Sequence, residues 1–530
     1  MTIHRRSIPL FAILLAAAHV AAQAPQHSAA TSAPASGPER VRAQYNAITS
    51  HLDAGGTLLV VANTDGVIED LVETVRNIAR QLPATGDTGD SAVMPYLDRL
   101  PAFLKSSGLY AVDGFGMSVV PRVDGQSDVK SFVYRDPAAA QLPFWQGIIG
   151  GAPKRLATLD YLPADTVVVR AGTADPRQLW KLINDAVRQV GGPDAAKAFE
   201  EFLNGAGKNL GTNLNSVIAS LDAEQFFSLQ LSSTQTMELP SANPADTNHP
   251  ALVIPNPSLL IGSAVRDGVL PLALQHALQQ GKIPVLCSTN GATKLYTVSL
   301  PVPLPFPFSP TFAVHRNMFL FGSTAEIVNS AIAAAEGPAG AHLPVNFQKA
   351  FAGLPKQNNG FAFIDRRFSE TMGKVQAYMA QQKQDPVAHL FMFQQLMQGE
   401  QERQLAAVFV NEKDGIAMRG TTTMSGRQIM LSMAVAPVAM MSAVAIPSFM
   451  KSREASRNSA CINNLRLIDH AKQQWAVENN KADADVPAEK DLAKYFKGGH
   501  LPVCPNGGKY AIRAVGEAPT CLHPGHALPE

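Results

Sequence analysis

The sequence predicts an α+β protein with a body of antiparallel or mixed sheets and helices on one face, followed by a long hydrophobic helix and a small α+β tail. Three observations predict this fold class. Short apolar strands alternate with amphipathic helices between residues 40 and 426, an uncharged stretch runs from Ile429 to Met450, and a helical pattern with short strands follows it.

The amino terminus has the pattern of a secretory signal peptide. His4-Arg5-Arg6 forms a basic start, Ile8 to Val20 is mostly apolar, and Ala22-Gln23-Ala24 is a small-residue cleavage site. Because the apolar run is short for a membrane span, we expect residues 1–24 to be removed and the protein to be exported to the cell envelope. Retention as an uncleaved anchor in the inner membrane is the alternative to a periplasmic location.

Residues 25–39 read as a flexible linker, because Ala, Pro, Ser, Thr and Gln dominate there and offer little apolar surface to bury. The remaining chain is long enough for two or three domains, and 46% of all residues are hydrophobic. Forty-four basic and 43 acidic side chains leave a net charge of +1, so nucleic acid is not an expected partner.

The body repeats one local pattern, in which an apolar strand leads through a polar turn into an amphipathic helix. Asp175 and Pro176 are typical helix-start residues in one of these units. We divide the body into two α+β halves, 40–240 and 258–426, joined by a Pro-rich linker at 241–257. The five strand–helix units are Thr57 to Leu82, Thr166 to Val190, Ser258 to Gln280, Asn317 to Glu336 and Gly360 to Gln382.

Two further strand pairs read as hairpins. Leu109 to Val120 and Val129 to Arg135 flank Asp124-Gly125, and Leu405 to Val410 and Gly415 to Thr422 flank Lys413-Asp414. Because hairpins pair antiparallel strands, we expect antiparallel or mixed sheets in the body.

The familiar catalytic motifs are poor matches here. Asp87-Thr88-Gly89 has the three-letter core of an aspartic protease but no flanking apolar strand, and Gly205-Ala206-Gly207-Lys208 lacks the first Gly and the final Ser or Thr of a phosphate loop. We therefore expect a protein that is not an enzyme and binds no cofactor. Cys287 is predicted to be a buried, inert thiol.

Residues 427–450 are predicted to form a hydrophobic helix. The 22 residues from Ile429 to Met450 carry no charge, which is enough to span a bilayer, although Ala and Met dominate and packing against protein is the competing interpretation. The residues predicted for membrane attachment or assembly are Ile429, Val435, Val438, Val444, Ile446 and Phe449.

The tail, residues 451–530, contains the one cluster of metal-ligand types: Cys504, Cys521, His523 and His526. Two thiolates and two imidazoles suit tetrahedral zinc, but the spacing is unusual. In an oxidising compartment a Cys504–Cys521 disulfide is the simpler expectation, and it would stabilise the tail by about 3 kcal/mol. No metal is therefore assigned.

The sequence around the uncharged stretch carries a resemblance. Ala445-Ile446-Pro447-Ser448-Phe449, Ala460-Cys461-Ile462-Asn463-Asn464-Leu465 and Ala471-Lys472-Gln473-Gln474-Trp475, with Leu501-Pro502-Val503-Cys504-Pro505 further on, resemble type IV pilins and type II secretion pseudopilins. The resemblance implies a helix that anchors and assembles subunits and a small head packed on its second half. Tail packing is assigned to Ile462, Leu465, Ile468 and Trp475.

The expected function is that of a non-enzymatic exported envelope protein, with a pilin-like module for membrane attachment or for assembly with a secretion or pilus-type apparatus. Its expected partners are membrane or envelope assembly proteins, or further copies of the chain through the hydrophobic helix. A periplasmic carrier that binds an apolar ligand in the body and a hydrolase without a recognisable motif are the alternatives.

Overall fold

The computed structural model describes residues 38–81, 94–239, 251–299, 308–338, 340, 342–382, 403–496, 499–505 and 507–522. The chain divides into two compact units, Met1–Ser432 and Met433–Glu530, and each is treated by itself. The predicted signal peptide and residues 25–37 of the predicted linker lie outside the described residues, as do Asp87 and Asp90, whereas Pro38 and Glu39 at the end of that linker already belong to a helix.

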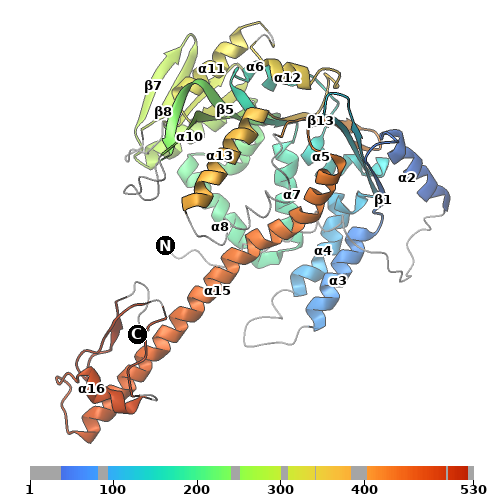
Figure 1. Cartoon of the computed structure of the whole chain (residues 1–530). Helices are drawn as coiled ribbons and strands as arrows, with labels where there is room; N and C mark the ends of the chain where they lie inside the picture. Colours follow the sequence, from blue (N-terminus) through green and yellow to red (C-terminus); the bar gives the residue numbers. More distant parts are fainter. Residues whose placement is uncertain are drawn as a thin grey trace. The chain divides into compact units, whose positions relative to one another are not determined.

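A single antiparallel sheet of thirteen strands forms the body, in the order β1-β2-β3-β13-β12-β11-β4-β5-β6-β10-β9-β8-β7. β1 lies at one edge and β7 at the other (Figure 1). The strands are β1 (Leu58–Asn63), β2 (Gly114–Pro121), β3 (Ser127–Tyr134), β4 (Thr166–Gly172), β5 (Leu221–Leu239), β6 (Leu252–Val265), β7 (Val285–Asn290), β8 (Thr293–Val298), β9 (Thr311–His315), β10 (Met318–Gly322), β11 (Gly360–Ile364), β12 (Leu405–Glu412) and β13 (Gly415–Thr422).

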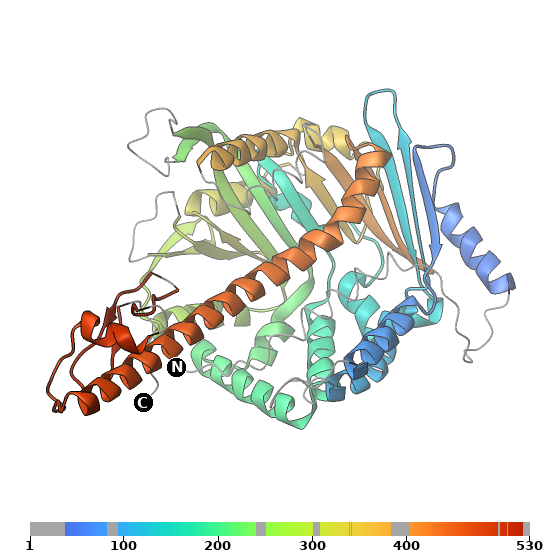
Figure 2. The ribbon, with the colours of Figure 1, turned by 60° about the horizontal axis from the view of Figure 1, so that its bottom comes forward.

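Helices connect these strands, and several of them form a layer of their own. In Figure 2 the blue to green helices α3, α4, α7 and α8 lie along one side of the sheet. The helices of the body are α2 (Pro38–Ser50), α3 (Val67–Gln81), α4 (Met94–Ser107), α5 (Pro143–Ile149), α6 (Thr158–Tyr161), α7 (Pro176–Gln189), α8 (Gly192–Leu210), α9 (Leu214–Ser220), α10 (Val269–Gln280), α11 (Ala325–Glu336), α12 (Val345–Ala350) and α13 (Arg366–Gln382).

Helices cover both faces of the sheet, so the prediction of helices on one face is wrong. Phe312 and Phe319 pack with α10, whereas their neighbours Ala313 and Leu320 pack with α11. Successive strand residues point to opposite faces, so α10 and α11 lie on opposite sides. Figure 1 shows α6, α11 and α12 together on the α11 side.

The five predicted strand–helix units and both hairpins are confirmed as local structures, except that Leu109–Ala111 is a 3-10 turn and the first hairpin strand begins at Gly114. The start of α7 illustrates the cause: the Asp175 side chain accepts a hydrogen bond from the backbone N–H of Arg177, and Pro176 occupies the first helical turn. Asp124 forms the same kind of local contact in the β2–β3 turn, where its carboxylate accepts from the N–H of Gln126.

The strands of the two predicted halves interleave in the one sheet. β3 pairs with β13, and β4 pairs with β11, so neighbouring strands come from distant parts of the chain. The Pro-rich stretch at 241–257 ends inside β6, where Pro255 and Pro257 lie opposite Thr236 and Leu231 of β5.

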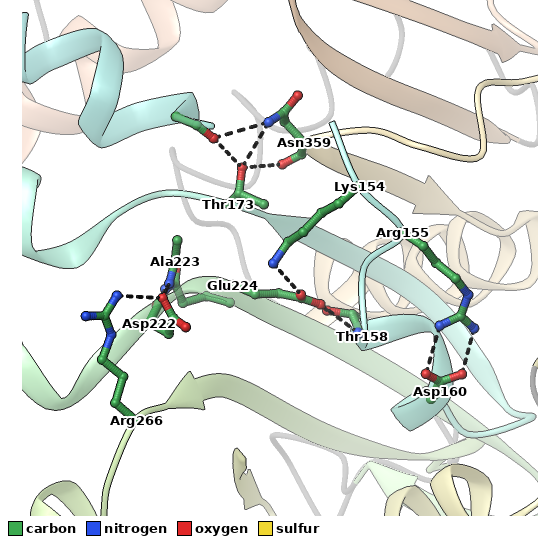
Figure 3. A network of polar contacts seen from close by, with 12 residues as sticks. Lys154, Arg155, Thr158, Asp160, Thr173, Asp222, Ala223, Glu224, Arg266 and Asn359 are labelled. Carbon is green, nitrogen blue, oxygen red and sulfur yellow. Dashed lines mark hydrogen bonds and ion pairs between the residues drawn. The ribbon is translucent and has the colours of Figure 1, made fainter. Parts of the chain in front are cut away.

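One buried amide closes the pairing of β4 and β11. Asn359, 1% exposed, donates through Nδ2 to the carbonyl oxygens of Gly150 and Gly151, and its Oδ1 accepts from the N–H of Asn411 at 2.9 Å. Its own carbonyl oxygen accepts from Thr173, as Figure 3 shows. The side chain therefore ties together the ends of β4, β11 and β12, and the loop that follows α5.

A second buried group joins α6 to β5. Glu224, 4% exposed, accepts from the N–H and the Oγ1 of Thr158 at 2.7 and 2.8 Å, and Lys154 Nζ lies 3.6 Å from its other oxygen (Figure 3). The nearby Arg155–Asp160 pair is bidentate but more exposed. The buried carboxylate therefore contributes more to stability than the surface pair.

The Met433–Glu530 unit is built on α15 (Gly426–Glu478), a helix of 53 residues that begins in the body unit. A separate hydrophobic helix at 427–450 is not found, so this prediction is wrong: the uncharged stretch is part of a helix that continues through Lys451, Arg453 and Glu454. Within the described residues, no helix meets both the length and the hydropathy that a membrane crossing requires. The head consists of α16 (Glu489–Leu492), a 3-10 turn (Ala493–Tyr495), β14 (Tyr510–Ala511) and β15 (Thr520–Cys521).

We predict that Glu224→Ala destabilises the body by about 2–4 kcal/mol, because it leaves the fully buried N–H and hydroxyl of Thr158 without an acceptor. The matched control is Asp160→Ala, which removes a carboxylate from the more exposed pair and should cost at most about 1 kcal/mol. Urea unfolding of both variants measures the difference, and equal losses would contradict the role given to Glu224.

Candidate functional site

The helix and the head of the Met433–Glu530 unit share one apolar core. Leu465 and Ile468 of α15 are fully buried and Trp475 is 9% exposed, while Ile462 is half-buried. Positions three, four and seven apart lie on one face of a helix, so these side chains form one stripe. Leu492, Val515 and half-buried Tyr495, Tyr510 and Ile512 of the head pack with part of this stripe.

Three cysteines meet at the end of this stripe. Cys461 on α15, Cys504 in the loop before β14 and Cys521 on β15 have Sγ atoms that all lie within 4.8 Å of one another. Cys461 and Cys504 are 0% and 3% exposed. The Cys504 and Cys521 sulfurs are 3.8 Å apart. We call these residues the cysteine centre.

Polar groups of the head hold the cysteine centre in place. The Tyr510 hydroxyl lies 3.4 Å from Cys461 Sγ as a donor, and Asn464 Nδ2 donates to both the Tyr510 oxygen and the Val503 carbonyl, each at 3.1 Å. Burial raises the pKa of the Cys461 thiol to about 12 and also raises the pKa of Tyr510. In the absence of a bound cation, Cys461 is therefore a neutral thiol at physiological pH.

The Cys504–Cys521 disulfide stays a prediction, since the two residues are neighbours but a third thiol adjoins them. The sequence interpretation missed Cys461, which is far from the other two along the chain. A signal was present: Cys461 is four residues before Leu465 and seven before Ile468, which places it on the same helical stripe. His523 and His526 lie outside the described residues.

For the predicted assembly residues of α15, the structure gives a partial account. Ile429 is half-buried at the start of the helix. The backbone of Val435, Val438, Val444, Ile446 and Phe449 is helical, and their side chains are not among those described.

A second feature lies in the body, on the α10 side of the sheet. Arg170, Phe227, Ile261 and Phe321 are directly opposite one another on the neighbouring strands β4, β5, β6 and β10. Phe312 on β9 lies opposite Phe321 and is buried against α10. Phe227 and Ile261, by contrast, are 42% and 39% exposed. We call Arg170, Phe227, Ile261 and Phe321 the open row.

Arg170 supplies the only cation of the open row. Its guanidinium carbon lies 4.2 Å from the centre of the Phe409 ring. Among the described side chains, no carboxylate forms an ion pair with it within 4.0 Å. The open row thus combines exposed apolar side chains with one positive charge at its end.

A groove of about 560 Å³ lies between β5 and α11. Hydroxyl and amide side chains line part of it, together with the apolar side chains of Ile327, Ala333 and Ala334. The polar residues include Gln230, Ser232, Thr234, Asn256, Ser258 and His342.

Another group with metal-ligand types, His51, Glu412 and Asp414, lies near the β12–β13 turn. His51 stacks on Phe132 with ring centres 3.8 Å apart, and its Nδ1 is 3.7 Å from a Glu412 oxygen. Arg419 also pairs with Glu412 at 3.3 Å. Stacking and ion pairing account for this arrangement without a metal.

Two smaller expectations from the sequence are wrong. Cys287 is exposed on the edge strand β7 rather than buried. The Gly205–Lys208 segment is helical and belongs to α8, whereas a loop was expected there.

Carboxylates gather where β1 leads into α3. Asp113, 5% exposed, has its Oδ2 3.6 Å from Arg40 NH2, and Asp65 pairs with the same guanidinium at 3.7 Å. Burial raises the pKa of Asp113 to about 6, and the charge of Asp65 adds to the rise. Burial also raises the pKa of Glu69 in the first turn of α3. Asp113 therefore takes up a proton near pH 6.

Comparison with known proteins gives no assignment. No family model matches the chain, no curated protein matches it, and no solved structure matches it.

We predict that Asp113→Asn stabilises the body at pH 7.5 by about 2 kcal/mol. A carboxyl with a pKa of about 6 in the fold and 3.8 when unfolded costs about 3 kcal/mol when ionised, a figure that already contains the attraction of Arg40. The amide that replaces it is buried without full hydrogen bonding, which costs about 1 kcal/mol. The penalty disappears as pH falls from 6 to 4, so the gain should vanish near pH 4. Thermal unfolding at both pH values measures it. Asp124→Asn in the exposed β2–β3 turn is the control, and a pH-independent effect of Asp113→Asn would contradict the pKa shift.

Proposed function

We propose that this chain is a non-enzymatic exported envelope protein whose Met433–Glu530 unit is a pilin-like assembly module. The observation that carries the proposal is the form of this unit. The last turns of one continuous helix, from Cys461 to Glu478, pack against a small head that contains two further cysteines. On the amino-terminal side of Cys461 the same helix extends for many more turns.

The division of the helix into two parts supports an assembly role. The part that carries the head has a buried stripe with charged and amide residues around it, as expected of a helix that packs on its own domain. The part before it, Ile429 to Met450, has no charge over 22 residues and resembles the segment through which pilin subunits associate. We propose that this part binds other envelope assembly proteins or further copies of the chain.

The departures from the pilin pattern restrict the mechanism. In that family the helix begins at the processed amino terminus after a Gly-Phe-Thr-Leu-Ile-Glu site, whereas here the body precedes it and Met430 stands where the glutamate would be. The proposed module therefore assembles laterally, through the side of its helix, without prepilin processing.

The test is the double variant Val438→Asp and Val444→Asp, which adds two charges to the uncharged stretch. We expect the unaltered full-length chain to self-associate or to co-sediment with the envelope fraction. In the variant the affinity of self-association, or the fraction of chain that co-sediments, should fall at least tenfold, because burying a charge at a helix contact is costly. Sedimentation velocity and envelope fractionation measure the two effects.

The matched control is Val477→Asp with Val486→Asp, which adds the same charges at positions that are 81% and 65% exposed, one at the end of α15 and one in the head. The control should associate like the unaltered chain. A monomeric, freely soluble full-length chain, or equal loss in both double variants, would overturn the proposed assembly through α15.

The open row favours a second candidate function, a carrier for an anionic amphiphile. Exposed Phe227 and Ile261 would contact an alkyl chain, and Arg170 would pair with a carboxylate at its end. This arrangement selects a ligand with one negative charge and a long apolar part over a neutral apolar one.

Palmitate binding to the purified full-length chain tests this candidate. We expect Arg170→Gln to weaken palmitate binding about tenfold, as one charge-assisted contact is worth about 1.5 kcal/mol or more, and Phe227→Asp to abolish it. Calorimetry compares palmitate with the matching long-chain alcohol, which should bind weakly and show no effect of Arg170→Gln.

Leu59→Asp is the control for Phe227→Asp, because Leu59 is 49% exposed on the edge strand β1, far from the open row in the strand order. Binding that survives in Phe227→Asp, or an alcohol that binds as well as palmitate, would exclude the open row as the ligand site.

A further inference from the structure

The cysteine centre is built like a ligand set for a metal ion. Three sulfurs from three separate segments, the helix α15, the loop before β14 and the strand β15, converge to within 4.8 Å of one another. Folding of the head alone brings them together, because Ile468 and Trp475 of the same helix pack against Leu492 and Val515.

The spacing of the sulfurs corresponds to a tetrahedral thiolate site. With Zn–S distances of about 2.3 Å, two ligands of a tetrahedral zinc are about 3.8 Å apart. Cys504 Sγ and Cys521 Sγ are separated by 3.8 Å. A disulfide would instead join two sulfurs at about 2.05 Å and leave the third thiol without a bond in a buried position.

The surroundings supply what thiolate ligands need. Tyr510 is a hydrogen-bond donor to Cys461 Sγ, and Asn464 in turn donates to the Tyr510 oxygen and to the carbonyl of Val503, next to Cys504. Outer hydrogen bonds of this kind orient the ligands of a metal and stabilise the negative charge on sulfur.

We propose that Cys461, Cys504 and Cys521 bind a structural zinc ion in the head. Binding replaces the three thiol protons, which pass to solvent, by the Zn²⁺ ion, and no oxidant or reductant takes part. Tetrahedral zinc takes four ligands, and the three thiolates supply three of them. The site needs only the folded head and does not depend on the assembly role proposed above.

Zinc content of the full-length chain, purified in zinc-supplemented medium, tests the proposal. We expect about one zinc per chain in the unaltered protein and in Cys287→Ser, which removes the exposed cysteine of β7. In Cys461→Ser the zinc content should fall at least tenfold. Intact mass under non-reducing conditions detects a disulfide, which lowers the mass by two hydrogens.

Cobalt substitution of the unaltered chain keeps the test independent of whether Cys461→Ser folds. A tetrahedral thiolate site gives intense sulfur-to-cobalt charge-transfer absorption, and added zinc should displace the cobalt and remove it. A chain that contains no zinc and has a mass lower by two hydrogens, one whose cobalt spectrum lacks these bands, or a zinc content unchanged in Cys461→Ser would each overturn the proposal.

Discussion

The antiparallel pairing of β4 with β11 holds the body together. Next to β11 lie β12 and β13, followed by β3, β2 and β1, and next to β4 lie β5, β6 and the strands out to β7. Asn359 closes the end of the pair with hydrogen bonds to three segments, and its burial means that each bond is made in a region of low dielectric, where an unmade one would be costly. Without this pairing, the sheet would separate into two parts with unpaired internal edges.

Local patterns in the sequence predict the pieces of this sheet but not their order. The strand–helix units follow from apolar periodicity and from caps such as Asp175, which are local. The pairing of β4 with β11 depends on contacts between residues far apart in the chain, which no local pattern contains. The sequence does contain a signal for helices on both faces of the sheet. β9 and β10 are apolar at successive positions, as expected of strands that are buried on both sides.

The uncharged stretch and the cysteines illustrate two different failures of sequence interpretation. The absence of charge from Ile429 to Met450 suggested a separate apolar helix, yet Ala and Met are good helix formers and the helix continues into the polar sequence that follows. The spacing of the cysteines along the chain favours a disulfide between Cys504 and Cys521. Cys461 lies one helical turn before Leu465, on the same buried face as Leu465 and Ile468, and this placement brings it to the other two cysteines.

The strand order also determines when the body can fold during synthesis. The first three strands reach the rest of the sheet only through β13, and Arg135, at the end of β3, bonds to Asn411 across 276 residues of chain. Until β12 and β13 have been made, the β1–β2–β3 meander has an open edge with backbone groups ready to pair elsewhere. A topology with so many distant contacts folds slowly, so the nascent amino-terminal half requires protection from aggregation for most of the time taken to synthesise the body.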